Sequence, residues 1–247
     1  MKHAQIHIGT SGWHYKHWVG KFYPPGLPSS EFLTFYAKHF KTAEINSSFY
    51  GLPSEKTLAA WRDGTPKDFL FSMKASRYLT HMKKLKDPEE PMKAFLDKAA
   101  VLDGKLGIIL FQLPPRWHCN LDRLRSFLDI LSEDHRYAFE FRDPSWFTEP
   151  VFKALQERNV ALCLYHLEGF VSPKEVTSDF VYVRLHGPGG AYQGRYETQT
   201  LSGWAGAFAN WRRQRREIFC YFDNDENGYA AMNALELTAM SEKDQGG

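Results

Sequence analysis

The sequence predicts a single (β/α)8 barrel of the TIM type, which belongs to the α/β class. Eight strand-like segments recur along the 247 residues, and helical patterns fill most of the gaps between them. At least six of these strands end in polar or charged residues. Their number and the chain length are those of this fold, in which the active site lies at the carboxyl ends of the strands. The polar residues at these ends are therefore the functional candidates.

Each strand is recognised as a short apolar or alternating run between turn signals. The eight strands are expected at Ile6–Gly9, Ala43–Asn46, Phe69–Lys74, Gly107–Leu113, Tyr137–Arg142, Val160–Tyr165, Phe180–His186 and Ile218–Asn224. Helices are expected after most of them, because apolar residues recur there at spacings that share one helix face. The expected helix caps include Ser54, Thr200 and Asn227.

The sixth unit lacks a clear helix. Residues 167–179 contain Pro173 and little periodicity, so a loop or a single helical turn is expected there. We expect one barrel domain over residues 1–240. Residues 241–247 are polar and end in two glycines, and we expect them to form a flexible tail.

Composition narrows the class of protein. Hydrophobic residues make up 43% and charged residues 24%, as in ordinary globular domains. The net charge of +2 is too small to indicate a nucleic-acid or membrane partner, and no apolar run approaches the roughly 20 residues of a membrane helix. Three scattered cysteines suit a reducing compartment. Because the chain enters a strand at Ile6, we expect no signal peptide and a cytoplasmic location.

Alternation within the strands selects the side chains that point inward. In the seventh strand Val181, Val183 and Leu185 face the helices, so Arg184 and His186 face the barrel axis. The same reasoning assigns further polar residues to the inward face. They are Glu44, Asn46, Lys74, Gln112, Glu140, Arg142 and Asp223, with Asn224 in place of Asp223 if the register shifts by one residue.

These side chains include three carboxylates and three fixed cations. Burying a charge costs several kcal/mol unless it is paired, so a self-neutralising network explains any one of them. Six charges at strand ends exceed what barrel closure requires, which indicates a site. Arg142 and Arg184 are suited to hold a phosphate or carboxylate bidentately, and Lys74 adds a third cation. The sequence therefore favours a small anionic ligand.

General acid–base chemistry needs titratable groups with separated pKa values. Glu44, Glu140 and His186 are the candidates for proton transfer, which favours an enzyme. Asn46, Gln112, Asp223 and Asn224 are expected to orient the ligand or support the site. Among the loop aromatics, Trp13 and Trp146 stand nearest to strand ends and are the best candidates to stack on a ligand.

Two other functions remain open. A metal-dependent hydrolase or isomerase would use Glu44, Glu140, His186 and Asp223, but three neighbouring cations compete for these carboxylates, so no metal ligand is assigned. A non-catalytic protein would bind a ligand, nucleic acid or a partner through its aromatic and lysine-containing loops. Gly9–Gly12 lacks the complete G-x-G-x-x-G pattern, so no nucleotide cofactor is expected, whereas a divalent metal is possible.

Six motifs resemble one known family. They are GTSGW at Gly9–Trp13, EINSSFY at Glu44–Tyr50, QLPP at Gln112–Pro115, EFRDPSW at Glu140–Trp146, RLHG at Arg184–Gly187 and YFDND at Tyr221–Asp225. Together they resemble the YecE-like family, catalogued as domain of unknown function 72, over about residues 6–240. Ser48 stands where that pattern has a threonine. The resemblance implies a TIM-type barrel, and the family brings no settled activity.

Overall fold

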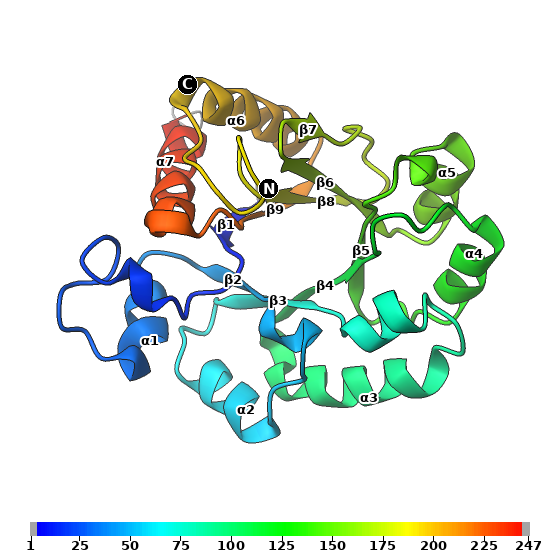
Figure 1. Ribbon diagram of the computed structural model, residues 1–247, viewed down its shortest axis with the longest axis horizontal. Helices are drawn as coiled ribbons and strands as arrows, with labels where there is room; N and C mark the ends of the chain where they lie inside the picture. The colour runs from blue at the N-terminus through cyan, green and yellow to red at the C-terminus, as the bar shows by residue number, and fades with distance from the viewer. Residues whose placement is uncertain (1–3, 244–247) are drawn as a thin grey trace. The chain divides into compact units, whose positions relative to one another are not determined.

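The computed structural model describes residues 4–243, and all eight predicted strands are present. Strands and helical segments alternate along the chain as in a (β/α)8 fold (Figure 1). The described residues divide into two compact units. Unit 1 contains 4–44, 164–172 and 179–243, and unit 2 contains 45–163 and 173–178.

Unit 1 is built around parallel strands. The strands are β1 (Ile6–Thr10), the greater part of β2 (Thr42–Ile45), the second half of β6 (Ala161–Leu167), β8 (Phe180–Leu185) and β9 (Glu217–Phe222). β9 pairs with β1 on one side and β8 on the other, with Ile218 opposite both Ile6 and Val181. A short strand, β7 (Phe170–Val171), pairs antiparallel with β6. The segment predicted as a loop or helical turn therefore contains a small hairpin.

Three helices complete unit 1. They are α1 (Phe32–Tyr36), α6 (Thr198–Arg213) and α7 (Tyr229–Lys243). In Figure 1, α6 and α7 lie side by side, and α7 also contacts β1 and β9. α6 buries Leu201, Trp204, Ala205, Phe208 and Trp211, which recur every three or four residues and so share one face. Short 3-10 turns occur at Lys16–Trp18, Ser29–Glu31 and Glu226–Gly228.

Two of the predicted helix caps are wrong. α6 begins at Thr198, and its N-cap is Glu197, three residues before the predicted cap Thr200. Asn227 lies within a 3-10 turn at a φ of 55°, and α7 begins only at Tyr229. Asparagine tolerates this left-handed conformation, which explains why a cap-type residue stands there without capping the helix. α7 extends to Lys243, and residues 244–247 of the predicted tail lie outside the described part of the chain.

Unit 2 contains the other parallel strands and four helices. The strands are β3 (Leu70–Lys74), β4 (Leu106–Gln112), β5 (Arg136–Glu140) and the first half of β6. The helices are α2 (Glu55–Asp63), α3 (Glu89–Ala99), α4 (Leu121–Asp129) and α5 (Glu149–Glu157). Ser54 caps α2 as predicted, because its Oγ accepts a hydrogen bond from Thr57 N at 3.1 Å.

Short helical turns connect these elements. They are the 3-10 turns Ser47–Phe49 (η3), Ala100–Lys105 (η5) and Pro144–Trp146 (η6), together with one π-helical turn, Tyr78–Met82 (η4). The π turn follows β3 after a gap of three residues. Such turns are rare and are often found at functional sites.

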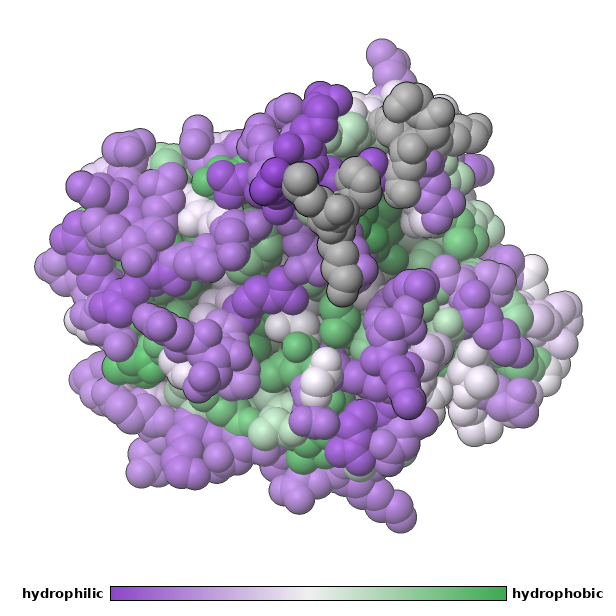
Figure 2. Space-filling model, turned by 180° about the vertical axis from the view of Figure 1, so that it is seen from behind, coloured by the Kyte–Doolittle hydropathy of each residue, from purple (hydrophilic) through white to green (hydrophobic). Residues whose placement is uncertain are grey.

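Apolar side chains are buried in both units, and charged and polar residues cover most of the face shown in Figure 2. Among residues 4–243, no helix combines the length and apolar character that a membrane span needs.

Candidate functional site

In unit 1, the carboxyl ends of β2, β8 and β9 bring together four charged or titratable side chains. Glu44 lies in β2, Arg184 in β8, and His186 and Asp223 directly follow β8 and β9. Glu44, Arg184 and His186 have no exposed surface, and Asp223 is 4% exposed. Alternation along the strands explains why Arg184 and His186 share a face.

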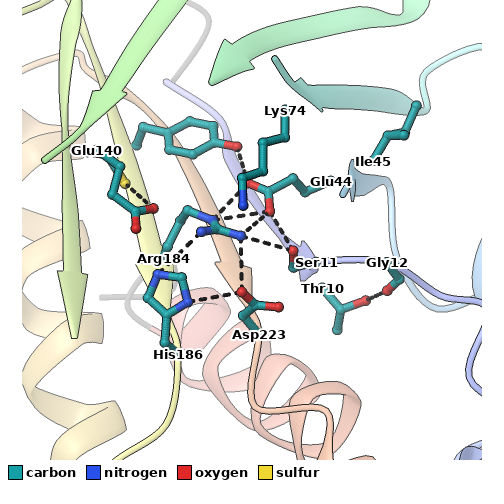
Figure 3. A network of polar contacts seen from close by, with 12 residues as sticks. Thr10, Ser11, Gly12, Glu44, Ile45, Lys74, Glu140, Arg184, His186 and Asp223 are labelled. Carbon is teal, nitrogen blue, oxygen red and sulfur yellow. Dashed lines mark hydrogen bonds and ion pairs between the residues drawn. The ribbon is translucent and has the colours of Figure 1, made fainter. Parts of the chain in front are cut away.

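Arg184 lies at the centre of this group (Figure 3). Its Nε donates to both carboxylate oxygens of Glu44 at 3.0 and 3.1 Å, and its Nη2 donates to Glu44 Oε1 at 2.6 Å. Nη2 also lies 3.1 Å from Asp223 Oδ2 and 3.1 Å from Ser11 Oγ. The guanidinium thus contacts two buried carboxylates, the pairing that buried charges require.

Two neutral donors complete the coordination of Glu44. Ser11 donates to Oε1 at 2.5 Å, and Tyr182 donates to Oε2 at 2.6 Å. Burial, followed by the negative charge of Glu44, raises the pKa of Tyr182 well above its usual value, so the phenol keeps its proton and donates. We call Ser11, Glu44, Tyr182, Arg184, His186 and Asp223 the Arg184 network.

The hydrogen bonds of His186 fix its tautomer. Its Nδ1 lies 2.9 Å from Asp223 Oδ2, and its Nε2 lies 3.3 Å from Arg184 Nη1. Because a guanidinium only donates, Nε2 must accept, and the ring proton lies on Nδ1 and is donated to Asp223. A carboxylate that orients an imidazole in this way is a recurrent arrangement in acid–base sites.

The loop after β8 covers His186. Tyr192 N donates to His186 O at 2.6 Å, and the Tyr192 ring, 44% exposed, packs edge-on against the imidazole with centroids 5.7 Å apart. Gly187 adopts a φ of 128°, and a Cβ there would lie 2.3 Å from Gln193 O. Glycine is therefore required for the loop to fold back at this point.

Asn224 holds the far end of the same loop. Its Nδ2 donates to Gly194 O at 2.8 Å and to Asn233 Oδ1 at 3.1 Å, and the residue is fully buried. Within residues 4–243 its Oδ1 has no hydrogen-bond partner. These contacts give Asn224 a role in supporting the loop.

Unit 2 contains a second charged group. Arg142 Nε forms an ion pair with Glu140 Oε1, and the thiol of Cys163 lies 3.7 Å from Glu140 Oε2. Glu140 is fully buried, and Lys74, at the end of β3, is 6% exposed. Lys74 Nζ lies 4.2 Å above the ring of Phe49, a cation–π contact.

Strand register places these polar residues of unit 2 on one face. Gln112 lies opposite Glu140, and Lys74 lies opposite Leu110, which shares its face with Gln112 two residues later. Gln112 Oε1 and Asn46 Oδ1 are buried atoms without a hydrogen-bond partner among the described residues. Such atoms usually indicate a missing water or ligand.

The two predicted stacking aromatics are buried. Trp146 is stacked on Phe141 at 4.8 Å, and its indole N–H donates to Trp117 O. Trp13 is 5% exposed, and its carbonyl accepts from Tyr23. Both tryptophans are thus almost completely covered, so their rings do not present an open face to a ligand in this structure.

The sequence interpretation missed three polar participants, Ser11, Tyr182 and His81. Tyr182 is two residues from Arg184 and has to share its face, which the alternation already indicated. Ser11 follows the first strand directly and lies opposite Glu44 in an isolated bridge. His81 stands in the π turn, and its sequence neighbourhood of charged residues gave no signal of burial.

The metal-dependent alternative requires several His, Cys, Asp or Glu side chains close together. Within residues 4–243, no three side chains of His, Cys, Asp or Glu are grouped so that they could hold a metal ion. In the Arg184 network the carboxylates instead contact a guanidinium and an imidazole. The metal-dependent alternative stays a prediction without support from this arrangement.

The fold and the polar strand ends define a (β/α)8 TIM-type barrel with charged residues at the carboxyl ends of its strands. A family model described as "Protein of unknown function DUF72" matches residues 7–247. The chain therefore belongs to the DUF72 family, and the resemblance to YecE-like proteins is confirmed.

Relatives and solved structures agree with this assignment. The chain is 28% identical over 269 residues to UPF0759 protein YunF of Bacillus subtilis, covering 95% of this chain and 94% of the relative. It is 32% identical over 148 residues to UPF0759 protein YecE of Escherichia coli K12, covering 58% of this chain and 51% of YecE.

The crystal structure of a DUF72 family protein, TM1631 from Thermotoga maritima, matches with a TM-score of 0.86 and 27% identity, covering 96% of this chain and 99% of that one. The fold of this chain is thus a single (β/α)8 TIM-type barrel. D-psicose 3-epimerase from Clostridium cellulolyticum matches with a TM-score of 0.56 and 12% identity, covering 97% of this chain and 98% of that one, which is a likeness of fold alone.

Proposed function

We propose that this protein is an enzyme that performs acid–base chemistry on a small polar, anionic molecule at the carboxyl ends of its strands. One observation carries the proposal: Asp223 holds the imidazole of His186 in one tautomer inside a buried ionic network. Burying ionised groups is costly, and a fixed imidazole among them has the organisation that proton transfer requires.

His186 is the proposed proton-transfer group of unit 1. Its Nε2 carries the lone pair, and its hydrogen bond to Arg184 Nη1 at 3.3 Å is long. A substrate proton close to Nε2 competes with this weak bond. Because Tyr192 packs against the ring, we propose that the Gly187–Gly194 segment moves when the substrate enters.

Arg184 and Glu44 are proposed as positioning residues. Both oxygens of Glu44 already accept hydrogen bonds from Ser11, Tyr182 and Arg184, which leaves little capacity to take a substrate proton. The guanidinium of Arg184 is likewise enclosed by Glu44 and Asp223. These contacts favour a role in holding His186 over the proton transfer expected of Glu44 and the anion binding expected of Arg184.

The second charged group supports the anionic character of the ligand. Lys74 is the last residue of β3 and Arg142 follows β5 by two residues, and ligands bind at these carboxyl ends in this fold. Glu140 remains a proposed proton-transfer group of unit 2, although its ion pair with Arg142 lowers its availability. Gln112 and Asn46, whose amide oxygens have no hydrogen-bond partner within residues 4–243, are proposed to contact the ligand.

Hydrogen–deuterium exchange tests the proposal without knowledge of the net reaction. Small sugar phosphates, hydroxy acids and keto acids are incubated with the protein in D2O, and loss of their C–H signals is followed by proton NMR. We expect exchange with a subset of compounds, and at least a hundredfold slower exchange with His186→Gln, since positioned acid–base groups contribute about 10²–10⁴-fold.

The matched control is His39→Gln, because His39 is an exposed histidine of the same unit. It should exchange at the wild-type rate. Exchange by His186→Gln at the wild-type rate would remove His186 from the mechanism. Absence of exchange or turnover with every compound that thermally stabilises the protein would instead favour a non-catalytic binding protein.

A further inference from the structure

His81 belongs to the charged group of unit 2, together with Phe49, Lys74, Glu140 and Arg142, which we call the Lys74 cluster. The imidazole packs edge-on against Phe49 with centroids 4.8 Å apart, and Lys74 Nζ lies over the same phenyl ring at 4.2 Å. Phe49 thus brings the ammonium and the imidazole together. His81 is only partly exposed.

The neighbours of His81 determine its tautomer. Thr80 Oγ1 donates its single hydrogen to Ser76 O at 3.0 Å, and it also lies 3.0 Å from His81 Nδ1. Thr80 must therefore accept from Nδ1–H, which leaves the lone pair on Nε2. The π turn at Tyr78–Met82 holds this arrangement, since it contains both Thr80 and His81.

Three cations lie near enough to His81 to lower its pKa. Burial, followed by the positive charges of Lys74, Arg77 and Arg142, lowers the pKa of His81 to about 4. At neutral pH the imidazole is consequently uncharged. An anion placed among these cations would oppose their effect and raise the pKa of the ring.

A buried polar atom on the same strand face as Glu140 points to a ligand. Gln112 is 9% exposed, its strand register places it beside Glu140, and its Oε1 has no partner among the described residues. A 180° flip of the Gln112 carboxamide exchanges its oxygen and its NH2 group, so that the NH2 group occupies the position of the unpartnered oxygen. Gln112 can therefore donate to an anion held by the Lys74 cluster.

We infer that unit 2 contains an oxyanion-binding site formed by Lys74, Arg142, Gln112 and His81, in which His81 takes up a proton when the anion binds. The ligand group is an oxyanion, a phosphate or a carboxylate, because the site combines an ammonium, a guanidinium and an amide as donors. The inference rests on the proposed function for the anionic character of the substrate, and it names the residues that bind the anionic group.

Isothermal titration with sodium sulfate tests the inference, because sulfate stays a dianion over the whole pH range used. We expect sulfate affinity to rise by up to about tenfold per pH unit between pH 7 and pH 5, with up to one proton taken up per anion. Proton uptake is measured by comparing buffers of different ionisation enthalpy. Nitrogen NMR should show that the His81 ring is neutral without sulfate and protonated with it.

His81→Asn should remove the pH dependence and weaken sulfate binding at pH 5 at least tenfold. His135→Asn, a histidine that precedes the amino end of β5, is the matched control and should behave as wild type. Sulfate binding by His81→Asn with the wild-type strength and pH slope would overturn the inference, as would a His81 ring that stays neutral with sulfate bound. If His81→Asn fails to fold, the nitrogen NMR of the wild type decides.

The two proposals fail separately. His186→Gln should bind sulfate as wild type does, because His186 belongs to the Arg184 network. If the wild type catalyses no deuterium exchange but binds sulfate with proton uptake, the proposed enzyme activity alone is contradicted. Deuterium exchange that depends on His186, together with no sulfate or inorganic phosphate binding, would contradict the oxyanion site alone.

Discussion

Arg184 in unit 1 lies near the carboxyl end of β8, and Arg142 in unit 2 lies two residues beyond β5; both contact a fully buried glutamate. Their surroundings differ. Arg184 also contacts Asp223, so carboxylates of its own unit surround it. Around His81, by contrast, Arg142 is joined by Lys74 and Arg77.

The difference separates two uses of buried charge. A cation enclosed by carboxylates holds a fixed geometry, and its removal leaves those carboxylates without compensation. Cations gathered around a neutral imidazole favour an incoming negative charge. The Arg184 network is thus suited to position His186, and the Lys74 cluster is suited to bind an anion.

Replacement of Arg184 should have the largest effect. Arg184→Ala leaves Glu44 and Asp223 buried without their guanidinium, so we expect a loss of about 3–5 kcal/mol in the free energy of unfolding. Urea denaturation measures it, with Arg77→Ala as the control, because Arg77 is an exposed member of the cations near His81 and should change stability by less than about 0.5 kcal/mol. Equal stability of the two variants would show that the network does not depend on its central cation.

Two neighbouring tyrosines allow a finer measurement in unit 1. Tyr182 and Tyr221 are both fully buried, with ring centroids 5.4 Å apart. Tyr182 donates to the carboxylate of Glu44, whereas Tyr221 bonds the neutral hydroxyl of Thr42 at 2.7 Å. Hydrogen bonds to charged groups contribute about 1.5–3 kcal/mol, against 0.5–1.5 kcal/mol for neutral ones.

Tyr182→Phe should therefore destabilise the protein by about 1–2 kcal/mol more than Tyr221→Phe, measured by urea denaturation of both variants. The two substitutions remove the same atom from equally buried rings, so differences in burial largely cancel. If both variants lose the same stability, Glu44 does not act as a charged acceptor in the folded protein.

The strands and most of the inward polar residues could be predicted from the sequence, because alternation and strand ends are local properties. Arg184, His186 and Asp223 were assigned in this way, and the structure brings them together. The pairing of Arg184 with Glu44 depends on two strands separated by 140 residues, and no local pattern reports such a contact.

The burial of Trp146 and the position of His81 could not be predicted for a related reason. Trp146 packs on Phe141 through the turn that follows β5, and this turn decides which side of the ring is covered. His81 reaches the Lys74 cluster through a π turn, a conformation without a sequence signal of its own. In both cases the connection after a strand, and not the strand, determines the role of the residue.

The smallest expected effect is a pH dependence that compares one histidine from each unit. Burial, followed by nearby cations, lowers the pKa of His81 to about 4, and burial followed by His186 lowers the pKa of His166. The unfolded chain binds protons near pH 6.5, before the folded His81 does, so stability is lost as the pH falls from about 6.5 towards 4. His81→Asn and His166→Asn should each reduce this loss.

Sulfate should distinguish the two histidines. An anion in the Lys74 cluster raises the pKa of His81 and so removes its share of the acid destabilisation, while the share of His166 stays. Thermal unfolding at pH 7, 6 and 5, in sodium sulfate and in sodium chloride of equal ionic strength, measures both. Sulfate should flatten the pH slope of the wild type and of His166→Asn and leave that of His81→Asn unchanged. If sulfate changes the pH slope of all three proteins equally, its effect does not depend on His81. The Lys74 cluster would then not differ from the Arg184 network in anion binding.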